Sequence, residues 1–391
     1  MKNIYLLGCS GSIGCQALEI LSTMPDVKVR TMSFGKNINK AIELINQFHP
    51  EYVCSQSEED SKRIKKLFPD IMVGFGEDGL VKAATLNPNE EGYLLNALVG
   101  MVGLKPTIEA IKINRHILLA NKETLVVGGE VIKELLKHHS SKLIPIDSEH
   151  SAIMQCLEGR SKDEVEKIII TASGGAFRDK DRNELKDVTI DDALAHPNWS
   201  MGKKITVDCA TMVNKGLEVM EAHYLFDMPY EKIECVMHLE SIVHSMVKYK
   251  DGSIIAQMAK PDMRIPIQNA LTYPTKQRFT LDETIELKDY FSLTFKELSF
   301  TRYPMLKLAY EVANAGGVLP LVFNSANEEA VRLFLDKKIK FLDIEKILTV
   351  SVNHFKVNNH KLDNLDDILE FDKVIRKYVN LEYLNIISRE V

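Results

Sequence analysis

Short apolar runs alternate with amphipathic segments through the first 147 residues. The run at 3–8 precedes a segment whose apolar positions recur at helical spacing, namely Ala17, Leu18, Leu21 and Met24. Further apolar runs, each followed by a helical pattern, lie near 27–34, 51–54, 71–75, 93–98, 116–120 and 143–146. This alternation predicts an α/β domain over residues 1–147, built on a mostly parallel, doubly wound sheet.

The pattern changes beyond residue 147. Strand-like runs lie at 168–172, 234–239, 244–249 and 253–258, and the last two flank Asp251-Gly252, a hairpin signal. We therefore expect a central α+β domain over residues 148–274. A polar, charge-rich stretch at 275–300 predicts a linker, and apolar positions with a 3.6-residue period predict a C-terminal helical bundle over 301–391.

Composition and charge narrow the class of protein. A chain of 391 residues is long for one core, and its net charge of −6 argues against a nucleic-acid partner. Apolar runs fall well short of the ~20 residues that span a bilayer, so we expect no membrane partner. The six cysteines form no CxxC pair, which favours reduced thiols and a cytoplasmic location.

Two carboxylates follow the last strand of the first domain. Asp147 and Glu149 are two residues apart, so on an extended backbone their side chains point the same way. Like charges held this close repel each other unless a proton or cation lies between them, and all-oxygen ligands suit Mg²⁺ or Mn²⁺. The alternative is a solvated loop in which Asp147 or Ser148 caps the next helix.

The first strand runs into Gly8-Cys9-Ser10-Gly11-Ser12-Ile13-Gly14, a GxxGxxG loop. A glycine turn between strand and helix suits phosphate binding and predicts a Rossmann-like nucleotide domain, although a plain tight turn is the alternative. The second strand ends in Gly35-Lys36-Asn37 without an acid. A cation in that place favours the 2′-phosphate of NADP(H) over the hydroxyl of NAD, unless Lys36 is an ordinary surface residue.

A third carboxylate lies at Glu218. If 212–222 is a helix, Asn214, Lys215 and Glu218 share one of its faces. That helix is apolar around most of its circumference, and Gly216 within it suggests a close backbone approach. Glu218 is therefore a candidate metal ligand, with a solvated helix face as the alternative.

Three loops complete the candidate chemistry. Trp199, the only tryptophan, lies in a loop at 194–202 that we interpret as a mobile flap over substrate rather than a surface-packed loop. Ser173 and its two glycines form a second anion cradle. Asn121-Lys122-Glu123 carry groups that can address a nicotinamide and an anionic substrate, although such residues also begin helices.

In combination these segments resemble the 1-deoxy-D-xylulose 5-phosphate reductoisomerase family over essentially the whole chain. The motifs are GCSGSIG at 8–14, GKN at 35–37, LANKE at 119–123, DSEHSA at 147–152, ASGGAF at 172–177, AHPNWSMG at 195–202, NKGLE at 214–218, HSMV at 244–247 and PDMRIPIQ at 261–268. The resemblance implies an NADPH- and divalent-cation-dependent homodimer. It would rearrange and reduce 1-deoxy-D-xylulose 5-phosphate to 2-C-methyl-D-erythritol 4-phosphate, an isoprenoid precursor.

The resemblance also implies residue roles. NADPH would contact Ser10, Gly11, Ser12, Ile13, Gly35, Lys36, Asn37, Asn121, Glu123 and Gly202. The cation would be held by Asp147, Glu149 and Glu218. The sugar phosphate would contact Lys122, Ser148, Glu149, Ser173, His196, Trp199, Asn214, Lys215 and Glu218, near His244. The catalytic set is Lys122, Asp147, Glu149, His196 and Glu218, and whether His196 donates a proton or only binds phosphate stays open.

Departures from the family pattern affect two loops. Cys9 and Ser10 replace the usual Ser-Thr of the glycine loop, and both are small enough for a backbone cradle. Cys209 stands where the family usually has a phosphate-binding serine, and a thiol is a weak hydrogen-bond partner. Rival functions are a metal-independent NADP-dependent dehydrogenase of a phosphorylated sugar or aldehyde, and a nucleotide-sensing protein without catalysis.

Overall fold

The computed structural model describes residues 2–277, 284–286, 288 and 292–388. The chain forms two compact units, each described by itself below. The N-terminal unit comprises Met1–Thr124, Glu130–Ser151 and Asp262–Thr284. The C-terminal unit comprises Leu125–Gly129, Ala152–Pro261 and Ile285–Val391.

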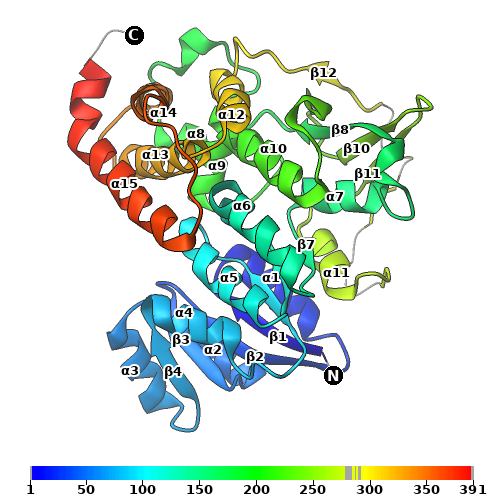
Figure 1. The fold of residues 1–391 in the computed structure, drawn as a ribbon, viewed down its shortest axis with the longest axis vertical. Helices are drawn as coiled ribbons and strands as arrows, with labels where there is room; N and C mark the ends of the chain where they lie inside the picture. Colours follow the sequence, from blue (N-terminus) through cyan, green and yellow to red (C-terminus); the bar gives the residue numbers. More distant parts are fainter. Residues whose placement is uncertain (1, 278–283, 287, 289–291, 389–391) are drawn as a thin grey trace. The chain divides into compact units, whose positions relative to one another are not determined.

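The N-terminal unit is built on a parallel sheet of order β4-β3-β2-β1-β5-β6-β7 (Figure 1). Its strands are β1 (Lys2–Leu7), β2 (Val27–Ser33), β3 (Tyr52–Ser55), β4 (Met72–Phe75), β5 (Tyr93–Asn96), β6 (His116–Leu119) and β7 (Leu143–Pro145). The chain works outward from β1 to β4 and then returns to pair β5 with β1. Ligands of such sheets bind where the strand order reverses, at the carboxyl ends of β1 and β5.

Helices connect these strands, apart from the last two helices of the unit, which come after β7 in the chain. The helices of the unit are α1 (Ser12–Leu21), α2 (Ile38–Phe48), α3 (Glu58–Leu67), α4 (Gly76–Thr85), the short 3₁₀ turn η1 (Met101–Gly103), α5 (Leu104–Lys112), most of α6 (Glu123–His138), the start of α7 (Ser148–Cys156) and α11 (Arg264–Thr272). Strand β1 is fully buried from Ile4 to Leu7, which makes it the centre of the core. The predicted Rossmann-like α/β fold is confirmed, with helix α1 ending at Leu21, before Met24.

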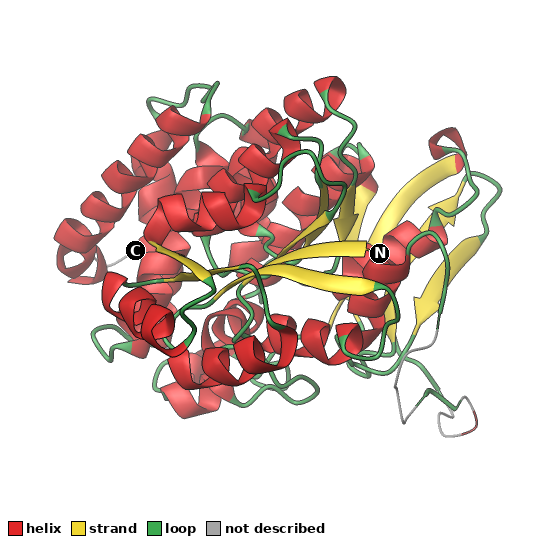
Figure 2. Cartoon of the chain, turned by 90° about the horizontal axis from the view of Figure 1, so that it is seen from below, coloured by secondary structure: helices red, strands yellow, loops and turns green. Residues whose placement is uncertain are grey.

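The C-terminal unit contains a mixed sheet of order β11-β10-β8-β9-β12. Its strands are β8 (Val165–Ala172), β9 (Ile233–Met237), β10 (Val243–Tyr249), β11 (Ile254–Met258) and β12 (Lys296–Glu297), drawn in yellow in Figure 2 with those of the other sheet. Strands β8 and β9 are parallel and the other pairs are antiparallel. The hairpin predicted at Asp251-Gly252 is present, with Gly252 at φ +88°.

The helices of this unit form two groups along the chain, one between β8 and β9 and the other after β12. They are α8 (Ile190–Leu194), α9 (Lys203–Thr211), α10 (Val213–Phe226), α12 (Pro304–Ala315), α13 (Leu319–Leu335), α14 (Phe341–Lys356) and α15 (Leu365–Ser388), with 3₁₀ turns η2 (Lys162–Glu164), η3 (Arg182–Leu185) and η4 (Tyr230–Lys232). The helical C-terminal region is as predicted. Part of the predicted linker at 275–300 lies outside the described residues, and the three-domain division stays a prediction.

Helix α10 packs closely against α12. A Cβ placed on Gly216 would lie 2.3 Å from the Cβ of Ala309, so only a glycine allows this approach. The close backbone approach predicted at Gly216 is therefore present.

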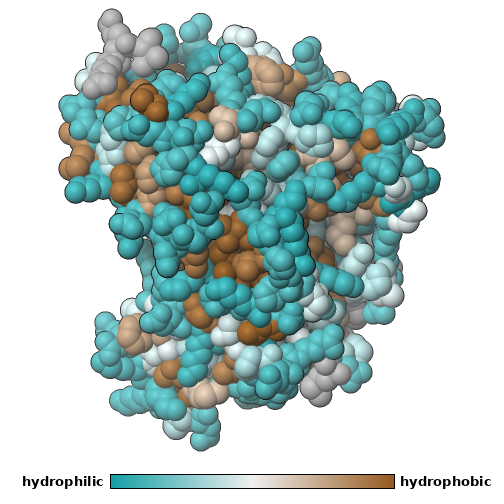
Figure 3. Space-filling model, in the orientation of Figure 1, coloured by the Kyte–Doolittle hydropathy of each residue, from teal (hydrophilic) through white to brown (hydrophobic). Residues whose placement is uncertain are grey.

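The surface is mixed in character. The face in Figure 3 is mainly hydrophilic, with apolar side chains in separate patches. Within the described part of the chain, we find no helix both long and apolar enough to cross a membrane.

Candidate active site

The glycine loop between β1 and α1 is a tight turn with an open centre. Gly8 has φ +87°, and a Cβ on Gly14 would lie 2.2 Å from the Gly8 carbonyl oxygen. At Gly11, the N-cap of α1, the nearest atom to an added Cβ is 3.4 Å away and no side chain caps the helix. The first turn of α1 therefore presents its backbone amides beside open space, which suits an anion. Ser10, Gly11, Ser12 and Ile13 all lie here.

The end of β2 is hydrogen-bonded to the glycine loop. The backbone N–H groups of Gly8 and Cys9 donate to the Ser33 carbonyl oxygen at 3.1 and 2.8 Å, and Gly8 also donates to Ser33 Oγ at 3.0 Å. Gly35, Lys36 and Asn37 follow in an exposed loop, where Asn37 caps α2 by accepting from the Lys40 amide. The structure thus places the second group of predicted NADPH contacts next to the first.

Asn121, which follows β6, is buried, and its side chain is held by several hydrogen bonds. Its amide nitrogen donates to the carbonyl oxygens of Leu98 and Gly100 at 3.0 and 2.9 Å and lies 3.0 Å from a carboxylate oxygen of Glu123. Its oxygen accepts from the Thr124 amide at 3.1 Å. These bonds fix the loop between β5 and α5, so Asn121 and Glu123 shape the sheet edge at which the nicotinamide is predicted to bind.

Lys122 and Asp147 form a buried ion pair across the ends of β6 and β7. Lys122 Nζ lies 2.9 Å from Asp147 Oδ2, and the two side chains are 8% and 10% exposed. The buried His150 places Nδ1 3.3 Å from Asp147 Oδ1. Burial opposes ionisation, but the charges of Lys122 and His150 hold the pKa of Asp147 well below its usual range. Asp147 is therefore an anion, as a metal ligand must be.

Ser148 and Glu149 begin α7 directly after this pair. The Glu149 amide donates to Asp147 Oδ1 at 3.1 Å, and Ser148 Oγ donates to Glu149 Oε2 at 2.5 Å. Asp147 therefore caps the helix, as the alternative interpretation predicts, but it does so from a nearly buried position rather than from a solvated loop. The cap also fixes the Asp147 and Glu149 carboxylates at one strand end. The metal site stays a prediction.

Helix α10 begins at an irregular junction. Met212 adopts φ +66°, a left-handed conformation that separates α9 from α10 and redirects the chain. On the first turns of α10, Asn214 Nδ2 donates to Glu218 Oε1 at 2.5 Å and Lys215 Nζ pairs with Glu218 Oε2. All three residues are buried, so the shared face is predicted correctly and is not solvated.

Ser173 and His196 meet in the C-terminal unit. His196 Nε2 lies 3.0 Å from Ser173 Oγ, while His196 Nδ1 accepts from the amides of Asn198 and Trp199 at 3.2 and 3.0 Å. Because Nδ1 accepts, Nε2 carries the proton of the neutral ring. Burial, and then the charge of Arg178, lower the pKa of His196 to about 4. Near neutral pH, His196 is thus a neutral hydrogen-bond donor.

The predicted flap lies beside these groups. Trp199 is half-buried and its ring centroid is 5.9 Å from that of His244 on β10. Gly202 caps α9 and is exposed. Cys209 lies on α9, where a Cβ on Gly175 would come 2.6 Å from the Cys209 carbonyl oxygen, so this position adjoins the Ser173 loop.

The structure gathers the predicted residues into two sets. The N-terminal set comprises Ser10 to Ile13, Gly35 to Asn37, Asn121 to Glu123 and Asp147 to Glu149. The C-terminal set comprises Ser173, His196, Trp199, Gly202, Asn214, Lys215, Glu218 and His244. Glu218 lies in a different unit from Asp147 and Glu149, so the shared metal site stays a prediction.

Sequence reasoning missed three residues that act on these sets. His150 pairs with Asp147, Arg178 lowers the pKa of His196, and Asn198 contacts the turn after β9. His150 was detectable, since it lies three residues after Asp147 at a helix start. For Arg178 and Asn198 the sequence carries no comparable signal, because their partners are distant in the chain.

Three family models match the chain. The model described as 1-deoxy-D-xylulose 5-phosphate reductoisomerase matches 4–129, and two models of that enzyme's C-terminal domain match 143–226 and 258–378. The Bacillus anthracis protein named 1-deoxy-D-xylulose 5-phosphate reductoisomerase 2 is 48% identical over 380 residues, covering 97% of this chain and 99% of the relative. The chain belongs to the 1-deoxy-D-xylulose 5-phosphate reductoisomerase family.

Other members of this family are also similar to the chain in sequence and in structure. The reductoisomerase of Macrococcus caseolyticus is 50% identical over 373 residues, covering 95% of this chain and 97% of the relative. A crystal structure of the enzyme with NADPH, fosmidomycin and magnesium has a TM-score of 0.95 and 33% identity, with both chains covered fully. The Zymomonas mobilis enzyme with NADPH has a TM-score of 0.89 and 36% identity, covering 99% of this chain and 100% of that one.

Proposed function

We propose that this chain converts 1-deoxy-D-xylulose 5-phosphate to 2-C-methyl-D-erythritol 4-phosphate, using NADPH and a divalent cation. The observation that carries the proposal is the buried Lys122–Asp147 pair beside Glu149, at the carboxyl edge of a dinucleotide-type sheet. A simple dehydrogenase does not require two neighbouring carboxylates at that edge. Family members of 48% identity over 97% of the chain carry the same named activity.

The N-terminal unit fits NADPH. The open space at Gly11 and the uncapped start of α1 suit the pyrophosphate, and Gly14 permits the close turn. Lys36 is exposed just after β2, where NAD-binding sheets carry an acid for the ribose hydroxyl. A cation there supports recognition of the 2′-phosphate.

The carboxylates fit a hard divalent cation. Asp147, Glu149 and Glu218 offer only oxygen atoms, which suits Mg²⁺ and also Mn²⁺. They would hold the cation, which supplies Lewis acidity for the skeletal rearrangement, while bound NADPH supplies the hydride for the reduction. Lys122 keeps Asp147 ionised and offsets negative charge at this edge.

The C-terminal unit would bind the phosphate of the substrate. Ser173 Oγ and the Nε2–H of His196 already adjoin one another, and Asn214 and Lys215 add a donor and a cation from α10. Because His196 is neutral, we assign it a hydrogen bond to the phosphate rather than proton donation. The polar thiol of Cys209 adds little, so Ser173, Asn214 and Lys215 carry the anchoring.

Two finer features belong to the same proposal. We infer a reducing, cytoplasmic compartment because all six cysteines, each within the described residues, are free thiols. We also infer a homodimer, as the family resemblance implies. In the domain division proposed above, 1–147 binds NADPH, 148–274 binds metal and substrate, and 301–391 forms a helical domain.

The test follows NADPH oxidation with 1-deoxy-D-xylulose 5-phosphate. We expect turnover only with both substrate and a divalent cation, arrest by chelator, and recovery on adding Mg²⁺. Lys36→Glu should lower the preference for NADPH over NADH by about 10-fold or more, the effect of losing one charge-assisted hydrogen bond. Lys66→Glu, at an exposed site on α3, is the matched control. Chelator-resistant turnover would instead support a metal-independent dehydrogenase, and NADPH binding without turnover a nucleotide sensor.

A further inference from the structure

A turn after β9 is held from inside by His238, which is fully buried. The amides of Ile242 and Val243 donate to His238 Nε2 at 3.2 and 3.0 Å, so Nδ1 carries the ring proton. His238 Nδ1 donates to the Thr294 carbonyl oxygen at 2.9 Å. One imidazole therefore joins both ends of the turn at 238–243 to a segment far along the chain.

The flap binds this turn through Asn198. Asn198 Nδ2 donates to the Leu239 carbonyl oxygen and to Ser241 Oγ, both at 2.7 Å. Arg178 Nη1 donates to the same Leu239 oxygen at 2.9 Å. The turn thus presents two acceptors to the flap, and their positions depend on the bonds made by His238.

The contacts of Asn198 lie between two other flap contacts. Two residues before it, His196 reaches Ser173, and the next residue, Trp199, lies against His244. The backbone amide of Asn198 also donates to His196 Nδ1 and so helps to set the orientation of that ring. Holding Asn198 therefore holds both neighbours that are assigned to substrate.

We propose that Asn198 and His238 are positioning residues that form a latch, in which the turn at 238–243 holds the flap in its docked conformation. This inference rests on the proposed function, since the flap residues His196 and Trp199 are those assigned to the sugar phosphate. Neither Asn198 nor His238 needs to contact substrate. Their role is to place His196 and Trp199 before substrate arrives, which lowers the ordering cost of binding.

The test uses Trp199, the only tryptophan, as an internal probe of the full-length chain. Asn198→Asp keeps the size of the side chain but removes the amide that donates both hydrogen bonds. It places a carboxylate oxygen against the Leu239 carbonyl oxygen, which repels it. We expect a red-shifted emission maximum and stronger acrylamide quenching in this variant without any ligand. Asn183→Asp, at an exposed site on η3, makes the same chemical change and should leave Trp199 emission as in the wild type.

Kinetics give the second readout. We expect kcat/KM for 1-deoxy-D-xylulose 5-phosphate to fall about 30-fold in Asn198→Asp, the effect of two hydrogen bonds. The rise in KM for NADPH should be much smaller, because of the flap residues only Gly202 is assigned to NADPH. His238→Leu should act in the same direction. Because both residues work through one turn, the double variant should lose much less than the product of the two single effects.

Different results of these experiments would overturn the latch and the proposed function. Trp199 emission and quenching in Asn198→Asp that match the wild type would overturn the latch, whether or not His238→Leu folds. Multiplicative effects in the double variant would also contradict it. A wild-type chain without reductoisomerase activity would instead overturn the proposed function, while the fluorescence comparison would still measure docking.

Discussion

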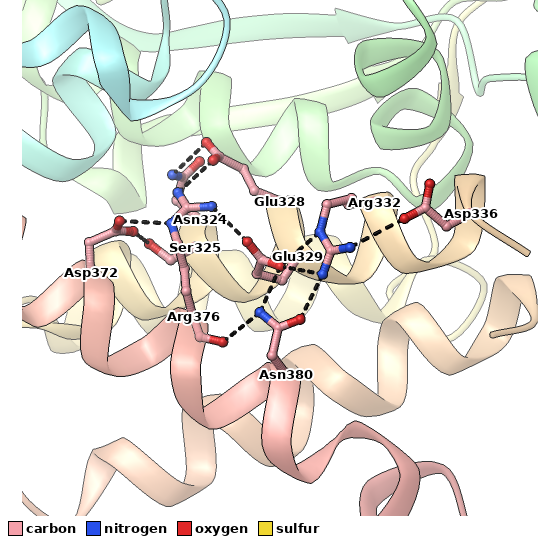
Figure 4. A network of polar contacts seen from close by, with 9 residues as sticks. All are labelled: Asn324, Ser325, Glu328, Glu329, Arg332, Asp336, Asp372, Arg376 and Asn380. Atoms are coloured by element: carbon pink, nitrogen blue, oxygen red, sulfur yellow. Dashed lines mark hydrogen bonds and ion pairs between the residues drawn. The ribbon is translucent and has the colours of Figure 1, made fainter. Parts of the chain in front are cut away.

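Two regions of this molecule contain ion pairs that differ in the cation they use. Between α13 and α15, Arg376 binds Asp372, Glu328 and Glu329, and Arg332 binds Glu329 and Asp336 (Figure 4). In the candidate site the cations are lysines: Lys122 pairs with Asp147, and Lys215 pairs with Glu218. The planar guanidinium of arginine binds several oxygens at once, whereas the ammonium group of lysine is a compact point charge.

The two kinds of ion pair have different roles, because the arginine network stabilises the fold and the lysine pairs belong to the candidate site. The arginine network joins two helices, since Arg376 on α15 reaches two glutamates on α13. The lysine pairs instead involve carboxylates that we assign to a metal. We therefore expect changes in the first region to lower stability and changes in the second to lower activity.

The largest expected effect tests the lysine-paired region. Glu149→Gln keeps the size of the side chain but removes a charge, so NADPH oxidation with substrate should fall by about 10³-fold or more, with unfolding free energy little changed. Glu158→Gln, an exposed change shortly after α7, is the control and should keep full activity. Metal-dependent turnover at the wild-type rate in Glu149→Gln would remove this residue from the site.

The next change tests the arginine network. Arg376→Met leaves three carboxylates without their shared cation, which should lower the free energy of unfolding by about 3 kcal/mol in urea denaturation. The value of kcat for the folded enzyme should stay within about two-fold of the wild type. Loss of kcat at unchanged stability would contradict the assignment of this region to structure.

A smaller effect is expected where the site helix α10 meets α12. Gly216→Ala would place a Cβ 2.3 Å from that of Ala309, so we expect a loss of about 2 kcal/mol from overpacking. Adding Ala309→Gly should recover most of this loss in thermal or urea unfolding. An unchanged stability in Gly216→Ala alone would mean that the two helices separate easily.

The smallest effect concerns His196. Its pKa is lowered from 6.5 to about 4, so between these values the unfolded chain binds a proton that the folded chain does not. Stability should therefore fall as pH is lowered from 6.5 to 4, by about 1 kcal/mol once the partial exposure of the ring is discounted. His196→Asn should reduce this slope in urea titrations at several pH values. An identical slope in the variant would assign the dependence to other groups.

The sequence predicts secondary structure better than it predicts which distant side chains contact each other. The strands of the nucleotide sheet follow from short apolar runs, the shared face of Asn214, Lys215 and Glu218 follows from helical spacing, and both are present. The pairing of Lys122 with Asp147 joins two strand ends and depends on strand order. Periodicity does not encode that order, so only the family resemblance linked these residues.

Flap contacts illustrate the same limit. The loop around Trp199 is predictable from its composition, since a lone tryptophan among Pro, Asn and Ser is unlike a core segment. The acceptors of Asn198 belong to a turn that follows β9, and their position depends on a bond from His238 to residue 294. Such contacts arise from tertiary packing and leave no pattern in the local sequence.

The central claim is that Asp147, Glu149 and Glu218 bind one divalent cation. Electron paramagnetic resonance of Mn²⁺, titrated with full-length protein in the presence of NADPH, measures this directly. The account predicts one bound Mn²⁺ per chain, with affinity lowered at least about 10-fold by Glu149→Gln and equally by Glu218→Gln. Mn²⁺ binding in Glu218→Gln that equals the wild type would contradict it.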